Sequence, residues 1–201
     1  MKPITFERTM DFWRSDKVDP AAYTQVQDGR SERLLELIGD ADRSWQICEL
    51  GCGPGRNLEA LRKAGFTKLT GIEINPLALQ VMRGAYPELA ESATILHGAL
   101  ETILPQIPKT WHYDLVFTMA VLLHIHPDSE WIFAHIARIV GRQLLVVEHE
   151  GYGCYDWCYS RDYRAIFENL GLKQAAQWDF GEACALADGR GPYIARLFVR
   201  E

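Results

Sequence analysis

The sequence predicts an α/β fold with a doubly wound, mostly parallel sheet of seven strands. Short apolar runs alternate with amphipathic stretches along most of the chain, which is typical of strand–helix units in a parallel sheet. The last two apolar runs follow one another without a helix between them. We therefore expect this terminal pair to be antiparallel and to close the sheet.

Each strand is predicted from an apolar run between turn signals, and each helix from caps and amphipathic spacing. The predicted strands are 46–51, 68–74, 93–98, 113–119, 142–150, 172–180 and 192–200. The predicted helices are 31–39 with Ser31 as N-cap, 56–65, 76–86, 100–104, 127–139, and 160–171 with Ser160 as N-cap.

Composition and charge narrow the class of protein. The net charge is −6 and the basic residues are scattered singly, which disfavours a nucleic-acid partner. No apolar run could span a membrane and the N-terminus lacks the apolar core of a signal peptide, so we expect a cytoplasmic protein without a membrane partner. The five cysteines lack the CxxC spacing of zinc sites, so we expect no metal.

The strongest functional signal is ELGCGPGRN at 49–57, between a predicted strand and a predicted helix. Gly51, Gly53 and Gly55 let the backbone turn tightly and approach a ligand that a Cβ would exclude. Glu73 ends the next strand, where an acidic residue in doubly wound folds holds the two hydroxyls of a ribose. Together they predict a nucleoside-containing ligand.

Two kinds of ligand compete for this turn. A nicotinamide site prefers GxGxxG, whereas this chain has GxGxG, with Arg56 where the third glycine would stand. Glu49 precedes the first glycine, and a carboxylate beside a helix start disfavours a pyrophosphate. A ligand without phosphate that carries a cationic end fits better.

The chain resembles the class I S-adenosylmethionine-dependent methyltransferases. The resemblance rests on ELGCGPGRN (49–57), GIEINP (71–76), HGALE (97–101) and YDLVFTMAVLLHIHPD (113–128), in that family's order. Within the family, GRNLEAL, GIEINP and VLLHIHPD are most similar to small bacterial methyltransferases linked to pseudaminic acid and surface-sugar biosynthesis. The resemblance implies a Rossmann-like fold, S-adenosylmethionine as cofactor and S-adenosylhomocysteine as product.

The resemblance also implies roles in a cofactor site. The three glycines would line the methionine and ribose part, and Glu49 would lie near the amino end. Glu73 would hold the ribose hydroxyls, and Ile74 would pack on the adenine. Ala99 stands where many members carry Asp or Asn, so the backbone at Ala99–Leu100 would serve the adenine instead. The other expected cofactor contacts are Asn57, Thr118 and Met119.

The methyl acceptor is expected beyond the carboxyl ends of the strands. His124 follows strand 113–119 and could accept a proton near neutral pH, or it could pack against the sheet. Glu148 and His149 close strand 142–150 and could contact the acceptor, or could mark the exit of the strand into water. These three are the predicted catalytic residues.

Aromatic side chains are predicted to form the walls of the acceptor pocket. The predicted substrate contacts are Tyr23, His126, Tyr152, Tyr155 and Trp157. The last three lie in the aromatic stretch 151–159, which is either a substrate lid or a loop packed down by its own rings. His126 has an alternative role as a cap of the next helix.

The sequence therefore predicts one methyltransferase domain. Residues 1–45 would form an N-terminal helical cap, 46–150 the cofactor-binding core, and 151–201 a lid loop, a helix and the closing strand pair. We expect an enzyme that methylates O or N of a small-molecule acceptor such as a sugar or an amine. The alternatives are an NAD(P)-dependent oxidoreductase and a non-catalytic S-adenosylmethionine-binding protein. The oligomeric state is not predicted.

Overall fold

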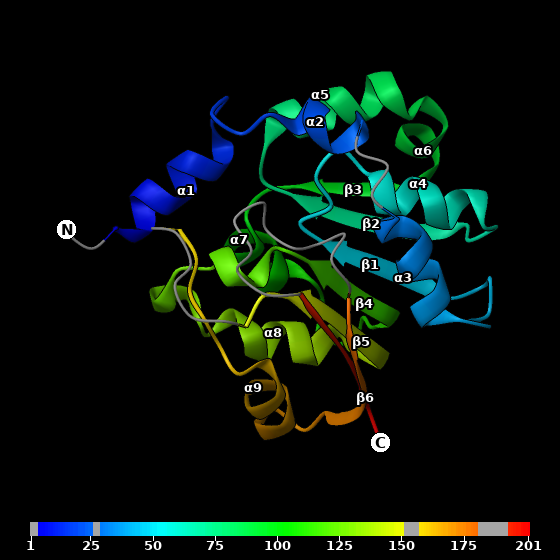
Figure 1. Cartoon of the computed structure of the whole chain (residues 1–201), viewed down its shortest axis with the longest axis vertical. Coiled ribbons are helices and arrows are strands. Elements are labelled where there is room, and N and C mark those ends of the chain that lie inside the picture. Colours follow the sequence, from blue (N-terminus) through cyan, green and yellow to red (C-terminus); the bar gives the residue numbers. More distant parts are fainter. Residues whose placement is uncertain (1–3, 26–28, 151–156, 181–192) are drawn as a thin grey trace.

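The structure is a computed structural model that describes residues 4–25, 29–150, 157–180 and 193–201. Within them, seven strands form one sheet in the order β3-β2-β1-β4-β5-β7-β6 (Figure 1). The bounds are β1 Gln46–Leu50, β2 Lys68–Glu73, β3 Thr94–His97, β4 Tyr113–Met119, β5 Val140–Glu148, β6 Lys173–Asp179 and β7 Ile194–Val199.

The pairing of the strands confirms the predicted fold class. β1 to β5 pair in parallel, whereas β7 pairs antiparallel with both β5 and β6. The strand order reverses between β1 and β4, so the carboxyl ends of β2, β1 and β4 lie next to one another. Open α/β sheets bind ligands at this edge, at the point where the order reverses.

Helices cover both faces of the sheet. Their bounds are α1 Phe6–Arg14, α2 Pro20–Gln25, α3 Arg30–Ile38, α4 Arg56–Lys63, α5 Pro76–Ala85, α6 Pro87–Ser92, α7 Leu100–Ile103, α8 Ile132–Ile139 and α9 Tyr163–Asn169. Short 3-10 turns lie at Leu104–Gln106, Leu122–His124 and Pro127–Ser129. No helix among the described residues is long and apolar enough to cross a membrane.

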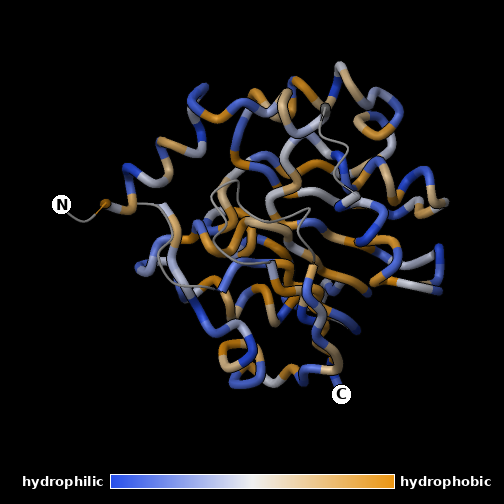
Figure 2. The backbone as a smooth tube through the Cα atoms, viewed as in Figure 1, coloured by the Kyte–Doolittle hydropathy of each residue, from blue (hydrophilic) through white to orange (hydrophobic). Residues whose placement is uncertain are grey.

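Alternation along the strands sends apolar side chains to two separate cores. Leu50 and Val116 pack in the core that contains residues of α7, α8 and α9. Ile47 and Phe117 point the other way and pack with residues of α3, α4, α5 and α6. The hydropathy of the chain follows this arrangement, with hydrophobic residues concentrated in the central sheet (Figure 2). The sheet is therefore a rigid base for its carboxyl edge.

Both predicted N-caps are wrong. α3 begins after Gly29, whose φ is 74°, and Ser31 is buried, with its hydroxyl donating to a side chain on α4. α9 begins after Asp162, whose carboxylate accepts a backbone N–H of the first turn. Ser160 therefore lies outside the helix.

Two other helices differ from their predicted form. The predicted helix 127–139 is divided into a 3-10 turn that begins at Pro127 and α8, which begins at Ile132. The chain after α5 continues into α6, with Pro87 in its first turn, where the prediction has no helix. Proline fits this position because its missing N–H would have no helical partner.

Candidate active site

A pocket of about 570 Å³ lies at the carboxyl ends of β1 to β4 and is also lined by α1 and α2. The predicted site residues that line it are Tyr23, Glu49, Gly51, Gly53, Asn57, Glu73, Ile74, Ala99, Leu100, Met119, His124 and His126. The described predicted residues outside the lining are Gly55, Thr118, Glu148, His149 and Trp157. Tyr152 and Tyr155 lie outside the described residues.

The glycines of the β1–α4 turn have different tasks. Gly51 has a φ of 68°, and a Cβ there would lie 2.5 Å from Cγ2 of Val121, so the turn packs directly against the chain after β4. Gly53 has a φ of 53° and nothing within 4 Å of an added Cβ, which leaves its backbone open to the pocket. Gly55 caps α4, and its Cβ would lie 2.8 Å from Leu89, so it serves packing behind the pocket.

Glu73 joins the ends of β1 and β2. Its Oε2 accepts the backbone N–H of Gly53 at 2.7 Å, and its Oε1 accepts that of Asn75 at 2.7 Å. A carboxylate has about four lone-pair sites, so the two oxygens retain capacity for a ligand. Burial raises the pKa of Glu73, while these backbone hydrogen bonds oppose the rise.

Glu49 is buried at the end of β1 and is only partly paired. Asn57 Nδ2 donates to Glu49 Oε1 at 2.8 Å, whereas Oε2 has no hydrogen-bond partner among the described residues. Burial raises the pKa of Glu49 to about 8. A buried carboxylate oxygen without a donor is costly, so the site favours a ligand that brings a cation or an N–H group to it.

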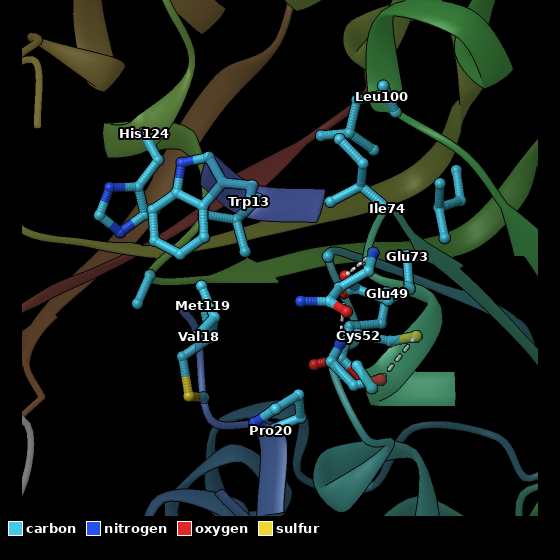
Figure 3. Close-up of a pocket in the computed structure, with 18 of the residues that line it drawn as sticks. Trp13, Val18, Pro20, Glu49, Cys52, Glu73, Ile74, Leu100, Met119 and His124 are labelled. Atoms are coloured by element: carbon cyan, nitrogen blue, oxygen red, sulfur yellow. Dashed lines mark hydrogen bonds between the residues drawn. The ribbon is translucent and has the colours of Figure 1, made fainter. Parts of the chain in front are cut away.

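The other side of this end of the pocket is apolar. Ile74 follows β2, and Ala99 and Leu100 are buried where α7 begins. Figure 3 shows Ile74 and Leu100 close to Glu73, across the pocket from Trp13 and His124. This arrangement offers apolar surface beside a carboxylate, as a nucleoside requires.

Glu148 lies behind the pocket wall. It is fully buried, and it accepts the hydroxyl of Thr118 at 3.0 Å and the backbone N–H groups of Val121, Leu122 and Leu123 at 2.9–3.2 Å. Burial raises its pKa to about 7, and these hydrogen bonds oppose the rise. Glu148 and Thr118 therefore fix the chain after β4 and do not face the pocket.

Arg161 holds the same turn from its other side. Its buried guanidinium donates to the carbonyl oxygens of Leu122 at 3.1 Å and Ile125 at 2.7 Å, and to the carboxylate of Glu130 at 3.0 Å. Nothing in the sequence around Arg161 marks this role. The segment that carries His124 is thus bonded through its N–H groups and through its carbonyls.

His124 lines the pocket and packs against α1. Its ring centroid lies 4.3 Å from that of Trp13, and its Nδ1 lies 2.9 Å from the carbonyl oxygen of Trp157. A carbonyl only accepts, so Nδ1 carries the proton and Nε2 has the free lone pair. Burial lowers the pKa of His124 to about 4, so the ring is neutral at pH 7.

Two more of the predicted acceptor contacts line the pocket. His126 lines the pocket, donates from Nε2 to the carbonyl of Ile4 at 3.1 Å and accepts the N–H of Asp128, so it also caps the next turn. Tyr23 lines the pocket and is 46% exposed.

Two of the candidates do not line the pocket. His149 is buried, with its ring 6.0 Å from that of Tyr193. Trp157 stacks on Phe12 at 4.7 Å between ring centroids. Both rings therefore pack behind residues that line the pocket or beside α1.

One aromatic and two basic side chains are among the lining residues that sequence reasoning missed. Trp13 projects from α1, and Arg30 and Arg56 stand at the starts of α3 and α4. The aromatic pair at 12–13 is the only sequence signal for Trp13. No cluster of three or more metal-binding side chains occurs in the described part of the chain.

Comparisons with known proteins place this site in context. Residues 47–143, just under half of the chain, match a family model described as a methyltransferase domain. The chain is 29% identical over 121 residues to a tRNA U34 carboxymethyltransferase from Colwellia psychrerythraea. The match covers 60% of this chain and 36% of that protein, so the chain spans about a third of its length.

Solved structures share the whole architecture. Magnesium protoporphyrin IX methyltransferase from Synechocystis PCC 6803 with bound S-adenosylmethionine matches with a TM-score of 0.72 and 18% identity, over 96% of this chain and 95% of that chain. The same enzyme with S-adenosylhomocysteine matches with a TM-score of 0.72 and 16% identity, over 98% and 100%. At such identities the likeness establishes the fold.

Proposed function

We propose that this chain is a class I S-adenosylmethionine-dependent methyltransferase, an enzyme that methylates an oxygen or nitrogen of a small acceptor; the match to a methyltransferase domain and the shared fold support this. The family's cofactor is S-adenosylmethionine, as the sequence predicts. When bound, it supplies a methyl group on a positively charged sulfur. The chain must bind it, orient the acceptor and exclude water.

The free oxygen of Glu49 is the observation that carries the proposal. The amino acid end of S-adenosylmethionine carries an ammonium, which would supply the donor that Glu49 Oε2 lacks. Asn57 holds the other oxygen in place. A nicotinamide dinucleotide has a pyrophosphate instead of an ammonium, so this site disfavours it.

The remaining cofactor contacts are proposed from the pocket lining. Glu73 would accept the ribose hydroxyls, and Ile74, Ala99 and Leu100 would enclose the adenine. Met119, Gly51 and Gly53 would lie along the methionine part. Gly55 would support the cofactor site through packing against α5 and α6. Thr118 would support it through its hydrogen bond to Glu148.

Arg30 and Arg56 supply positive charge to the pocket. The cofactor's amino acid end also carries a carboxylate, and guanidinium groups bind carboxylates well. We therefore assign the carboxylate to the part of the pocket that these two residues line.

The acceptor is proposed to lie beside α1 and the chain after β4. His124, His126 and Tyr23 are the described candidates for contact with it. Glu148, His149 and Trp157 would act indirectly, because they do not line the pocket. The lid of residues 151–159 and the division into cap, core and closing segment remain predictions.

The acceptors to be tested include more chemical classes than the sequence suggested. A relative is named for its action on tRNA, so the expectation of no nucleic-acid partner is not supported. The resemblance to enzymes of surface-sugar biosynthesis adds amino and acidic sugars to the acceptors to be tested, and it remains a prediction. The cytoplasmic location also remains a prediction.

Methyl transfer can be tested with S-adenosylmethionine labelled in the methyl group. The full chain would be incubated with amino sugars, phenols, amines and unmodified tRNA, each in a separate reaction. We expect label in a small-molecule fraction with wild type and a strong loss with Glu73→Ala. If the folded chain binds S-adenosylmethionine but labels nothing, the non-catalytic binding function replaces this proposal.

A further inference from the structure

One wall of the pocket is uncharged. It consists of three residues of α1 (Thr9, Met10 and Trp13) and of lining residues between positions 120 and 126. The charged side chains that line the described pocket, namely Arg30, Glu49, Arg56, Glu73 and Glu101, all belong to other segments. An ionised acceptor would lose water at this wall without gaining a partner of opposite charge.

The uncharged wall has a flat, apolar surface. Met10 and Trp13 are three positions apart on α1 and so share a face of the helix, on which Met10 is buried. Trp13 lies against His124, with 46° between the ring planes, and Figure 3 places this pair across the pocket from Ile74 and Leu100. An aromatic or other flat apolar body gains contact area there.

His124 differs from His126, the other histidine of this wall, because only one of its two ring nitrogens has a hydrogen-bond partner among the described residues. Nδ1 donates to the Trp157 carbonyl at 2.9 Å, and Cys158 Sγ lies farther away, at 3.7 Å. Nε2 therefore carries a lone pair that can accept a hydrogen bond. No described residue donates one to it. It can receive an O–H or N–H proton, but it cannot donate to a carboxylate.

We propose that the methyl acceptor is an uncharged molecule with a flat apolar body and a hydroxyl group, which donates its proton to His124 Nε2 and is methylated on oxygen. This inference rests on the proposed function, because only a methyltransferase needs an acceptor. The body would lie against Met10 and Trp13.

The methyl-transfer step balances for a hydroxyl acceptor, which must lose its proton, and Nε2 supplies the base. The acceptor oxygen forms a bond to the methyl carbon as the carbon–sulfur bond breaks, and that electron pair goes to sulfur, which becomes a neutral thioether. The oxygen then carries both the methyl group and its proton, and it loses the proton to Nε2. Burial lowers the pKa of His124 to about 4, so the ring is a weak base. A protonated ether is acidic enough to give up its proton even to such a weak base.

The state of His124 can be measured without an acceptor. Ring 15N chemical shifts of histidine-labelled protein report which nitrogen carries the proton. We expect the signals assigned by loss in His124→Gln to show the Nδ1–H form, neutral from pH 8 down to about pH 5. His112→Gln, an exposed site away from the pocket, is the control for assignment. The Nε2–H form or a charged ring at pH 7 would overturn the proposal.

The acceptor class can be measured by ligand-observed NMR on the full chain saturated with S-adenosylhomocysteine. The probes are matched fragments of equal size: neutral phenols and aryl alcohols, benzoates, and benzylamines. We expect the neutral hydroxyl fragments to bind at this wall and to weaken about tenfold in His124→Gln. They should also weaken in Trp13→Leu, which keeps apolar bulk but removes the ring.

Two results would overturn this proposal separately from the proposed function. Preferential binding of benzoates or benzylamines would replace the neutral acceptor with a charged one. No weakening of the neutral fragments in either variant would remove His124 and Trp13 from the acceptor site. Failure to bind S-adenosylhomocysteine at all would instead contradict the proposed function.

Discussion

Glu49 and Asn57 are joined across the β1–α4 turn by a hydrogen bond of 2.8 Å, while the second Glu49 oxygen has no partner in the part of the chain that the structure describes. The buried end of β1 therefore carries a carboxylate with one oxygen hydrogen-bonded and the other available to a ligand. Such a group resists ionisation until a cation arrives, because burial disfavours its charged form.

The first prediction concerns pH. Burial raises the pKa of Glu49 to about 8, so the ligand-free carboxyl is mostly protonated at pH 7. A bound ammonium favours the carboxylate, so binding should release a proton. The affinity for S-adenosylmethionine should then weaken as pH falls below 8, by up to about tenfold per pH unit. Calorimetry at pH 6.5, 7.5 and 8.5 in two buffers measures both effects.

Glu49→Gln is the matched variant for this measurement. It should bind more weakly and with little dependence on pH. Without ligand, a raised pKa in the folded state means that stability is lost as pH rises from about 4.5 through 8. The variant should not share that loss, and a pH-independent affinity in the wild type would refute this account of Glu49.

A second prediction concerns Glu73, the carboxylate that we propose to accept the ribose hydroxyls. Glu73 accepts two backbone N–H groups at 2.7 Å, so Glu73→Ala should weaken S-adenosylmethionine binding about 100-fold and destabilise the fold by ~1–3 kcal/mol. Glu91→Ala, at an exposed position on α6, is the control and should change neither quantity. Equal affinities for wild type and Glu73→Ala would remove Glu73 from the site.

A third prediction compares the effect on stability of adding a Cβ at two glycines, one tightly packed and one in open space. Gly51→Ala places a Cβ 2.5 Å from Val121 at a φ of 68°, so it should cost ~1–3 kcal/mol of unfolding free energy. Gly84→Ala, in α5 with open space around its Cβ, should instead stabilise the fold by about 0.5–1 kcal/mol. Urea unfolding measures the free energy of unfolding of the two variants. Changes of the same sign in both would contradict the prediction.

A fourth prediction concerns the turn that carries His124. Glu148→Gln replaces an accepting oxygen with an amide that donates, so at least one backbone N–H between positions 121 and 123 loses its partner. We expect a loss of ~2–4 kcal/mol and faster hydrogen exchange at these amides. Glu168→Gln, in a partly exposed pair with Arg164, should change stability by less than about 0.5 kcal/mol. Unchanged exchange in Glu148→Gln would show that the turn does not depend on this carboxylate.

The strands and the glycine turn could be predicted because their signals are local. Strand 113–119 is bounded as predicted, and Glu73 and the turn at 51–55 follow from spacing along two adjacent strands. The caps of α3 and α9 were mispredicted because serine is a common N-cap, whereas Gly29 and Asp162 hold these positions. A choice between neighbouring polar residues is decided by the path of the chain, which the sequence does not display.

The surroundings of His124 could not be predicted because their contacts join distant parts of the chain. Glu148 looks like a polar strand end, yet its oxygens bond the turn after β4. Trp13 meets His124 only when α1 lies over that turn. The pattern of residues within one segment does not indicate that it contacts the other.

The central claim is that this pocket binds S-adenosylmethionine, and calorimetric titration of the full chain tests it most directly. We expect S-adenosylmethionine and S-adenosylhomocysteine to bind on the order of micromolar, and NAD⁺ not to bind. Gly53→Val, which adds a side chain where the structure leaves open space, should abolish binding while the protein still unfolds cooperatively. A folded wild-type protein that binds neither sulfur ligand would contradict the account.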